Sequence, residues 1–136
     1  MVPGRKQLSG CILDEEADKV VEEMKRVLEG KFATGQSDGC KNITKTSLVA
    51  SLINMEYTPY PLNMHDMSAL PKTAVQLLEF MVGEITYAVD ILKVQIMAWC
   101  MDAGGDAAKM HHLLVKKMLH IMVVDCWAHQ VHLHNM

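Results

Sequence analysis

The residues best suited to chemistry are histidines, and they gather near the C-terminal end of the chain. Six of the seven histidines lie at or beyond position 111. On a helix, Asp125, His129 and His132 are spaced i, i+4 and i+7, so that they share one face. Carboxylate and imidazole groups are ligands for zinc and other first-row metals. This face could therefore hold a metal ion or transfer protons.

A metal site on this face needs a further ligand from a second helix. If a turn at residues 104–105 joins two antiparallel helices, Glu79 is the carboxylate nearest to His129. The candidate metal ligands are then Asp125, His129, His132 and Glu79. The competing interpretation is that the histidines lie on the surface and interact with the negative end of a helix dipole. We favour it because the HExxH and ExxH motifs are missing and the last histidines lie near a fraying terminus.

Other catalytic patterns are also missing from the sequence. It contains no glycine-rich phosphate loop and no GxSxG nucleophile motif. Cys126 lies three residues before His129, but a helix would place the two side chains next to each other, facing outward. The sequence also shows no identifiable oxyanion hole for a cysteine nucleophile. We therefore expect a protein that is not an enzyme and that carries no cofactor.

The composition narrows the choice of partners. The formal net charge is −3, and arginine occurs only at Arg5 and Arg26, which argues against nucleic-acid binding. Twelve methionines suit an adaptable apolar interface. The N-terminal residues do not resemble a signal peptide, and the four cysteines lack CxxC spacing. We expect an intracellular protein with reduced thiols.

The elements that would position these residues are predicted from apolar spacing. A flexible segment is expected at 1–13, followed by a helix at 14–30. That helix has an apolar stripe formed by Ala17, Val20, Val21, Met24, Val27 and Leu28. Glycine, serine and aspartate predict a loop at 31–43, and apolar spacing predicts a short helix at 44–55. Prolines predict an irregular connection at 56–70.

The rest of the chain, 71–133, is predicted to be a long helical hairpin. Its helices would span 71–103 and 106–133, since neither range contains an internal breaker and glycines separate them. In such a hairpin Cys100 and Cys126 are roughly 25 Å apart at about 1.5 Å per residue, too far for a disulfide. Three or four charges in each helix argue against membrane insertion, whereas association with a membrane surface or a membrane complex stays open.

These patterns predict a single all-α domain, a small bundle of about four helices built on the antiparallel hairpin. The expected function is that of a non-enzymatic structural or adaptor subunit, which packs an apolar, methionine-rich helical face against other protein subunits or a second copy. The alternative is a small metal- or cofactor-binding bundle that uses the histidine-rich end. The expected partner interface consists of Leu77, Phe80, Val82, Val89, Ile91 and Ile96.

Overall fold

The structure is a computed structural model that describes residues 4–41, 46–71, 73–102 and 104–128. It is a mixed α/β fold with one five-stranded sheet, so the all-α prediction is wrong. The elements in chain order are α1 Arg5–Leu8, α2 Cys11–Leu28, β1 Phe32–Lys41, β2 Ser47–Met55, β3 Thr58–Asp66, α3 Ala74–Asp90, β4 Gln95–Met101, α4 Gly105–Lys117 and β5 Met122–Asp125.

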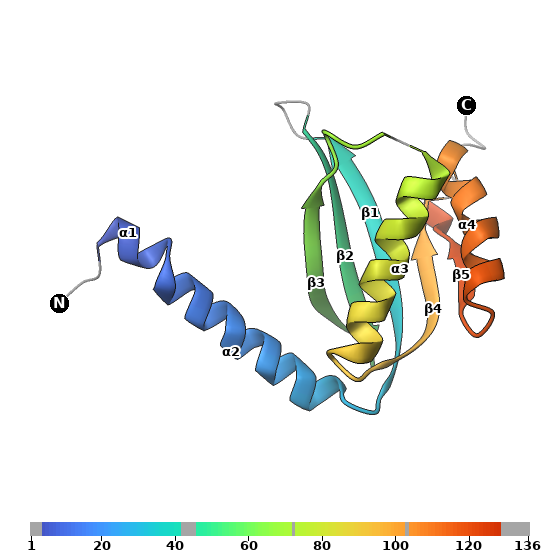
Figure 1. The fold of residues 1–136 in the computed structure, drawn as a ribbon. Coiled ribbons are helices and arrows are strands. Elements are labelled where there is room, and N and C mark those ends of the chain that lie inside the picture. The colour runs from blue at the N-terminus through green and yellow to red at the C-terminus, as the bar shows by residue number, and fades with distance from the viewer. Residues whose placement is uncertain (1–3, 42–45, 72, 103, 129–136) are drawn as a thin grey trace.

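The sheet has the strand order β3-β2-β1-β4-β5, with β1 at its centre. β1 pairs antiparallel with β2 and parallel with β4, and β4 pairs parallel with β5. Figure 1 shows α3 and α4 on one face of this sheet, while α2 extends away from the body and carries α1 at its far end. The N-termini of α3 and α4 lie at the edge where β1 and β4 end (Figure 1).

The core lies between the sheet and the two helices that cover it. Its largest fully buried side chain is Trp99 on β4. The indole ring packs over Gly35 of β1, where a Cβ atom would lie 2.1 Å from the ring. The indole Nε1 donates to Ser37 Oγ (3.2 Å), which shares a second hydrogen bond with Ser51 Oγ (2.8 Å). Trp99 therefore joins the three central strands through both packing and hydrogen bonds.

The range 31–43 was predicted to be a loop, but most of it is β1. Its small residues allow the large Trp99 side chain to approach the strand. Along β1, Ala33, Gly35 and Ser37 are buried and alternate with exposed residues, the pattern of a strand with one covered face. The composition that indicated a loop is thus explained by packing.

The predicted helix at 44–55 and the predicted irregular connection at 56–70 form the hairpin β2–β3. Ser51, Ile53 and Met55 are buried at every second position, as a strand requires. Its turn consists of Glu56 and Tyr57, both with positive φ, as in a tight two-residue hairpin turn. The prolines of β3 are tolerated because β3 is an edge strand, with no neighbour on its outer side.

The long helical hairpin at 71–133 is wrong as well. The helix expected at 71–103 ends at Asp90, and the chain turns through Lys93, which has a φ of 57°, into β4. The helix expected at 106–133 ends at Lys117 and is followed by β5. No glycine or proline marks either change, so the sequence offered no breaker there.

The first predicted helix is confirmed, because α2 covers most of 14–30. It begins at Cys11, however, within the segment that was expected to be flexible. In the part of the chain that the structure describes, no helix is long and apolar enough to span a membrane.

Candidate functional site

Two carboxylates lie at the carboxyl ends of the adjacent parallel strands β1 and β4. Asp38 is near the end of β1, and Asp102 directly follows β4. The last registered pair of these strands is Gln36 with Cys100. Continuing the register by two residues sets Asp38 level with Asp102 on the neighbouring strand. The two residues are therefore neighbours on adjacent strands at one edge of the sheet.

Both aspartates line the same two cavities. The smaller cavity has a volume of about 110 Å³, and Cys100 and Cys126 also line it. The larger one, about 200 Å³, is bounded by Leu77 of α3 and by α4 in addition to the strands. Asp38 and Asp102 thus line both cavities at this edge of the sheet.

Each carboxylate already accepts a local backbone hydrogen bond through one oxygen. Asp38 Oδ1 accepts from the Gly39 amide (2.8 Å), and Asp102 Oδ1 accepts from the Gly104 amide (3.3 Å). Aspartate commonly bonds in this way where a strand passes into a turn or a helix begins. These backbone hydrogen bonds are sufficient to explain an aspartate at each position. They do not explain why the two aspartates line the same cavities.

The amino end of α4 adds backbone donors at the same edge. α4 begins at Gly105, and its N-cap is Gly104 rather than a residue with a capping side chain. Free amides and the helix dipole make such an end favourable for anions. Ala107 of this first turn lines the larger cavity with Asp38 and Asp102. Asp102 is therefore adjacent to the start of α4, whose first turn lines a cavity that Asp38 also lines.

This arrangement suits a hard divalent cation. Mg²⁺ is usually held by one or two protein carboxylates and completes its octahedron with water and substrate phosphates. Within the described ranges, no group of three or more histidine, cysteine or acidic side chains could hold a metal ion. A cation here would therefore take two protein ligands and obtain its other ligands from water or from a bound molecule.

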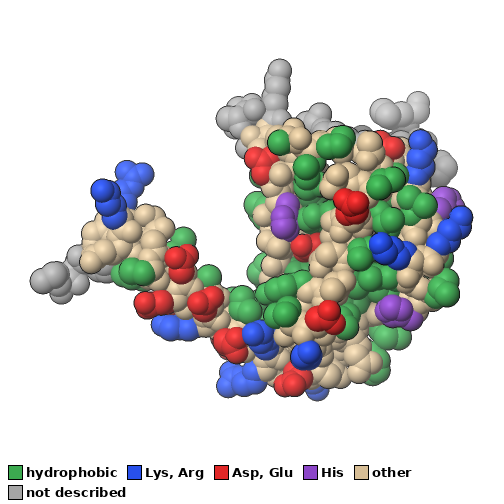
Figure 2. All heavy atoms as spheres, viewed as in Figure 1, with side chains coloured by type: hydrophobic (Ala, Val, Ile, Leu, Met, Phe, Trp, Pro, Cys, Tyr) green, Lys and Arg blue, Asp and Glu red, His purple; other side chains and the backbone are tan. Residues whose placement is uncertain are grey.

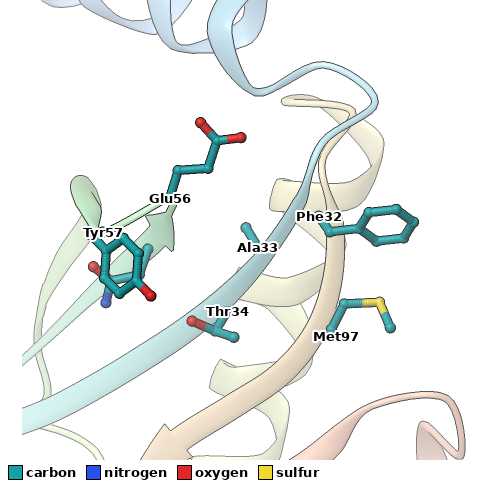
Figure 3. A pocket seen from close by; sticks show the side chains of 7 residues that line it. Phe32, Ala33, Thr34, Glu56, Tyr57 and Met97 are labelled. Atoms are coloured by element: carbon teal, nitrogen blue, oxygen red, sulfur yellow. The ribbon is translucent and has the colours of Figure 1, made fainter.

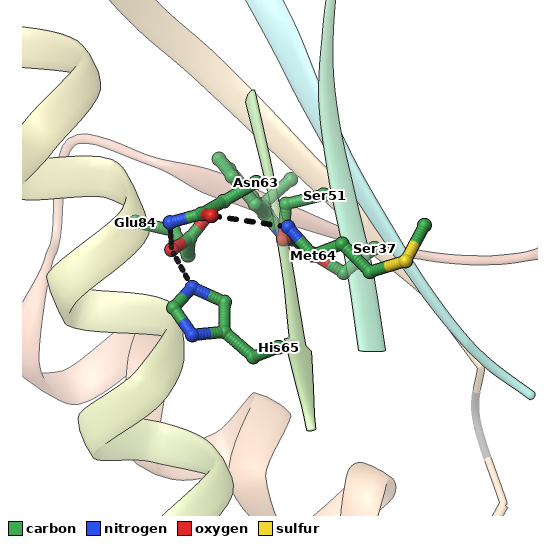
Figure 4. A network of polar contacts seen from close by, with 7 residues as sticks. Ser37, Ser51, Asn63, Met64, His65 and Glu84 are labelled. Carbon is green, nitrogen blue, oxygen red and sulfur yellow. Dashed lines mark hydrogen bonds and ion pairs between the residues drawn. The ribbon is translucent and has the colours of Figure 1, made fainter. Parts of the chain in front are cut away.

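A second polar cluster joins α3 to β3 (Figure 4). Glu84 is buried, and its Oε1 lies 3.1 Å from His65 Nε2 and accepts from Asn63 Nδ2 at 3.4 Å. His65 also contacts the Phe80 ring edge-on, with centroids 4.8 Å apart. Glu84 Oε2 is buried with no hydrogen-bond partner among the described residues. The cluster holds a helix against an edge strand, and we assign it a structural role.

The histidine-rich end gives a different result from the one expected. Asp125 lies at the end of β5, not on a helix, and its Oδ1 is 2.8 Å from Nδ1 of the buried His111 on α4. Glu79 is exposed on α3 and accepts from Gln76 at 3.4 Å. His129 and His132 lie outside the described residues. The four proposed metal ligands are therefore not tested as a set.

The six residues expected to form a partner interface are divided between two elements and the turn that joins them. Leu77, Phe80 and Val82 of α3 are partly buried. Val89 and Ile91, at the end of α3 and just beyond it, are 39% and 44% exposed. Ile96 belongs to β4 and is buried in the core. The six do not form one continuous stripe on a helix, because the helix that was to carry them ends at Asp90.

A larger hollow lies near the start of β1, away from the two aspartates. Its volume is about 490 Å³, and it is bounded by the turn residues Glu56 and Tyr57 and by Phe32 and Met97. Figure 3 shows Phe32 and Met97 next to each other on β1 and β4. Among the described residues that line it, Glu56 is the one carboxylate. This hollow provides mainly apolar contact area, whereas Asp38 and Asp102 provide groups that could bind a cation.

Sequence reasoning missed Asp38 and Asp102 because it assigned Asp38 to a loop and Asp102 to the end of a predicted helix. A signal was nevertheless present. Each aspartate ends a short run that can be read as a strand, and the carboxyl ends of parallel strands are where α/β proteins bind ligands. Comparison with known proteins adds no assignment, since no family model and no curated protein matches the chain at a significant level.

Proposed function

We propose that the carboxyl edge of β1 and β4 binds a divalent cation and, through it, a phosphate-bearing ligand. The observation that carries this proposal is the shared position of Asp38 and Asp102, which lie near the carboxyl ends of adjacent parallel strands and line the same two cavities.

The topology supports the choice of this edge. After β1 the chain continues to β2 on one side, and β4 later pairs with β1 on the other side. β1 and β4 are adjacent parallel strands, and ligands of open α/β sheets bind outside the carboxyl ends of such strands. The amides at the start of α4 provide a place for phosphate oxygens next to the cation.

The lining of the larger of the two cavities favours binding without turnover. In the larger cavity, the ionisable side chains among the described residues are Asp38 and Asp102, both of which the cation would occupy. On the helix side the lining residues that the structure describes are Leu77 and Ala107, neither of which can transfer a proton. We therefore retain the expectation of a non-enzymatic protein, as part of this proposal.

Manganese binding tests the proposal, because Mn²⁺ prefers the same oxygen ligands and can be followed by water-proton relaxation. We expect the wild-type chain to bind Mn²⁺. We expect Asp38→Asn and Asp102→Asn each to weaken binding by about tenfold or more, since losing a residue that binds the metal directly costs at least as much as losing one that orients it. Asp14→Asn, on the exposed part of α2, is the matched control. A wild-type chain that does not bind Mn²⁺, or aspartate variants that bind like wild type, would overturn the proposal.

A second candidate is the structural or adaptor role, which a different observation favours. α2 projects from the body (Figure 1), and Figure 2 shows acidic side chains gathered along it. Leu13 and Val20, on this projecting part, are 58% and 54% exposed. A helix with exposed apolar residues and no neighbour can dock on another subunit. An intracellular location goes with this role and is likewise a proposal.

Sedimentation velocity checks the second candidate. If α2 joins subunits, the wild-type chain self-associates as its concentration rises, and Val20→Glu reduces that association because it introduces a charge into an apolar contact. Val115→Glu, an exposed apolar position on α4, is the control. A wild-type chain that stays monomeric at high concentration, or equal effects of both variants, would contradict self-association through α2.

A further inference from the structure

Cys100 and Cys126 are neighbours in the fold, although the helical hairpin would have kept them far apart. Cys100 lies on β4, level with Val124 of β5, and Cys126 follows two residues later. The Cys126 amide donates to the Met101 carbonyl at 2.8 Å, which holds Cys126 against the end of β4. Because side chains alternate along a strand, Cys100 and Cys126 point to the same side of the sheet.

The two side chains also lie near each other. The Cys100 and Cys126 side chains share a hydrogen bond, and both line the cavity of about 110 Å³. Each residue is partly buried, so the pair is neither sealed in the core nor fully exposed. Two thiols in contact at the rim of a cavity can be reached by a small disulfide such as oxidised glutathione.

We propose that Cys100 and Cys126 are a reversible dithiol–disulfide site, oxidised by a small-molecule disulfide of the glutathione class. This inference is independent of the cation site, since it needs only the two thiols and their access to the cavity.

The reaction proceeds in two exchanges. One cysteine, as its thiolate, attacks a sulfur atom of oxidised glutathione, forms a mixed disulfide and releases one reduced glutathione. The second cysteine then attacks the protein sulfur of that mixed disulfide and releases the second glutathione. Two electrons pass from the protein to glutathione, and the two thiol protons end on the two glutathione thiols. The new bond, of about 2 Å, ties the end of β5 to β4.

Acidic groups lie close to the two thiols. Burial raises the pKa of Cys100, and the negative charges of Cys126 and Asp125 raise it further. Asp38 and Asp102 line the same cavity, and His111 of α4 is bonded to Asp125.

Peptide mapping without reduction tests the proposal. The folded wild-type chain is equilibrated with oxidised and reduced glutathione at pH 8, alkylated and digested. We expect a peptide pair joined through Cys100 and Cys126, a loss of two hydrogen atoms in the intact mass, and full reversal by excess dithiothreitol. The same treatment of Cys11→Ser/Cys40→Ser, which retains only these two cysteines, should give the same crosslink.

Two controls make the result decisive. Cys126→Ser should stop at a stable glutathione adduct on Cys100 or remain unmodified, and it should never yield the crosslink. Cys11 is exposed on α2 and serves as an internal reference for a thiol with no adjacent cysteine. If oxidised glutathione leaves Cys100 and Cys126 both as thiols, or links either one to Cys11 or Cys40 instead, the proposal is overturned. The cation site is measured separately with Mn²⁺ on the reduced chain, so failure of one inference leaves the other standing.

Discussion

At the scale of single residues, Gly35 and Trp99 determine how the centre of the sheet packs. The indole ring occupies the space in which any other residue at position 35 would place its Cβ atom. Ser37, two residues along the same strand, then receives the indole N–H. A residue as large as tryptophan can therefore lie flat on β1 with its polar atom satisfied. Glycine at position 35 is required by this contact and not by a turn.

Gly35→Ala tests this contact. The added methyl group would overlap Cε3 and Cζ3 of Trp99, so that the ring or the strand must move. We expect a loss of about 3 kcal/mol in the free energy of unfolding, at the upper end of the usual cost of overpacking, measured by urea denaturation.

Gly83→Ala is the matched control for that substitution. Gly83 is exposed on α3, and a Cβ added there meets nothing within 4 Å. Alanine should stabilise the helix at this position by roughly 0.5–1 kcal/mol. Equal effects of the two variants would show that Trp99 does not constrain position 35.

The candidate site also shows, residue by residue, what the sequence could reveal. The types of Asp38 and Asp102 are visible in the sequence, but their proximity depends on the parallel pairing of β1 with β4, which are separated by some sixty residues of chain. The same holds for Cys100 and Cys126, whose contact depends on the parallel pairing of β4 with β5. Pairings over such separations leave no local pattern, so chemistry assembled by them was not predictable from spacing.

At the scale of elements, the helix α2 was predictable and the strands were not. α2 is amphipathic with a single period, and its apolar residues recur at three- and four-residue steps, so its location was correct. β2 and β4 contain apolar residues on both faces or carry a bulge, which makes their spacing compatible with a helix. β1 was hidden by small polar residues, and β3 was hidden by prolines that an edge strand tolerates.

The turns explain why the elements between these strands were merged. The β2–β3 turn uses Glu56 and Tyr57 at positive φ, where Asn-Gly is the usual signal. The chain leaves α3 through Lys93, again at positive φ without glycine. Because each of these residues is compatible with a helix, the sequence shows no break where the structure has one. Strand pairing in the sheet therefore determined the structure of these segments, in spite of their local helix propensity.

At the scale of the whole molecule, α2 is attached to the body only near its C-terminal end. Leu28, its last residue, is fully buried, and Met24 one turn earlier is also buried. The turn that follows is fixed by two backbone bonds between segments, from Gly30 N to Lys93 O and from Gln95 N to Lys31 O, both 2.8 Å. Figure 1 shows the rest of the helix extending beyond the sheet. α2 therefore packs against the body near its C-terminal end, and the rest of the helix projects from it.

This attachment predicts that two similar side-chain truncations on α2 will differ in their effect on the free energy of unfolding. Leu28→Ala removes a fully buried side chain from the core and should cost about 2–5 kcal/mol in the free energy of unfolding. Val20→Ala removes a side chain that is 54% exposed, and it should change that free energy by less than about 0.5 kcal/mol. Urea denaturation of both variants, at a concentration where the wild type is monomeric, measures the difference. A comparable loss for both would mean that α2 packs along its whole length and does not project, which would remove the free helical surface on which the adaptor proposal depends.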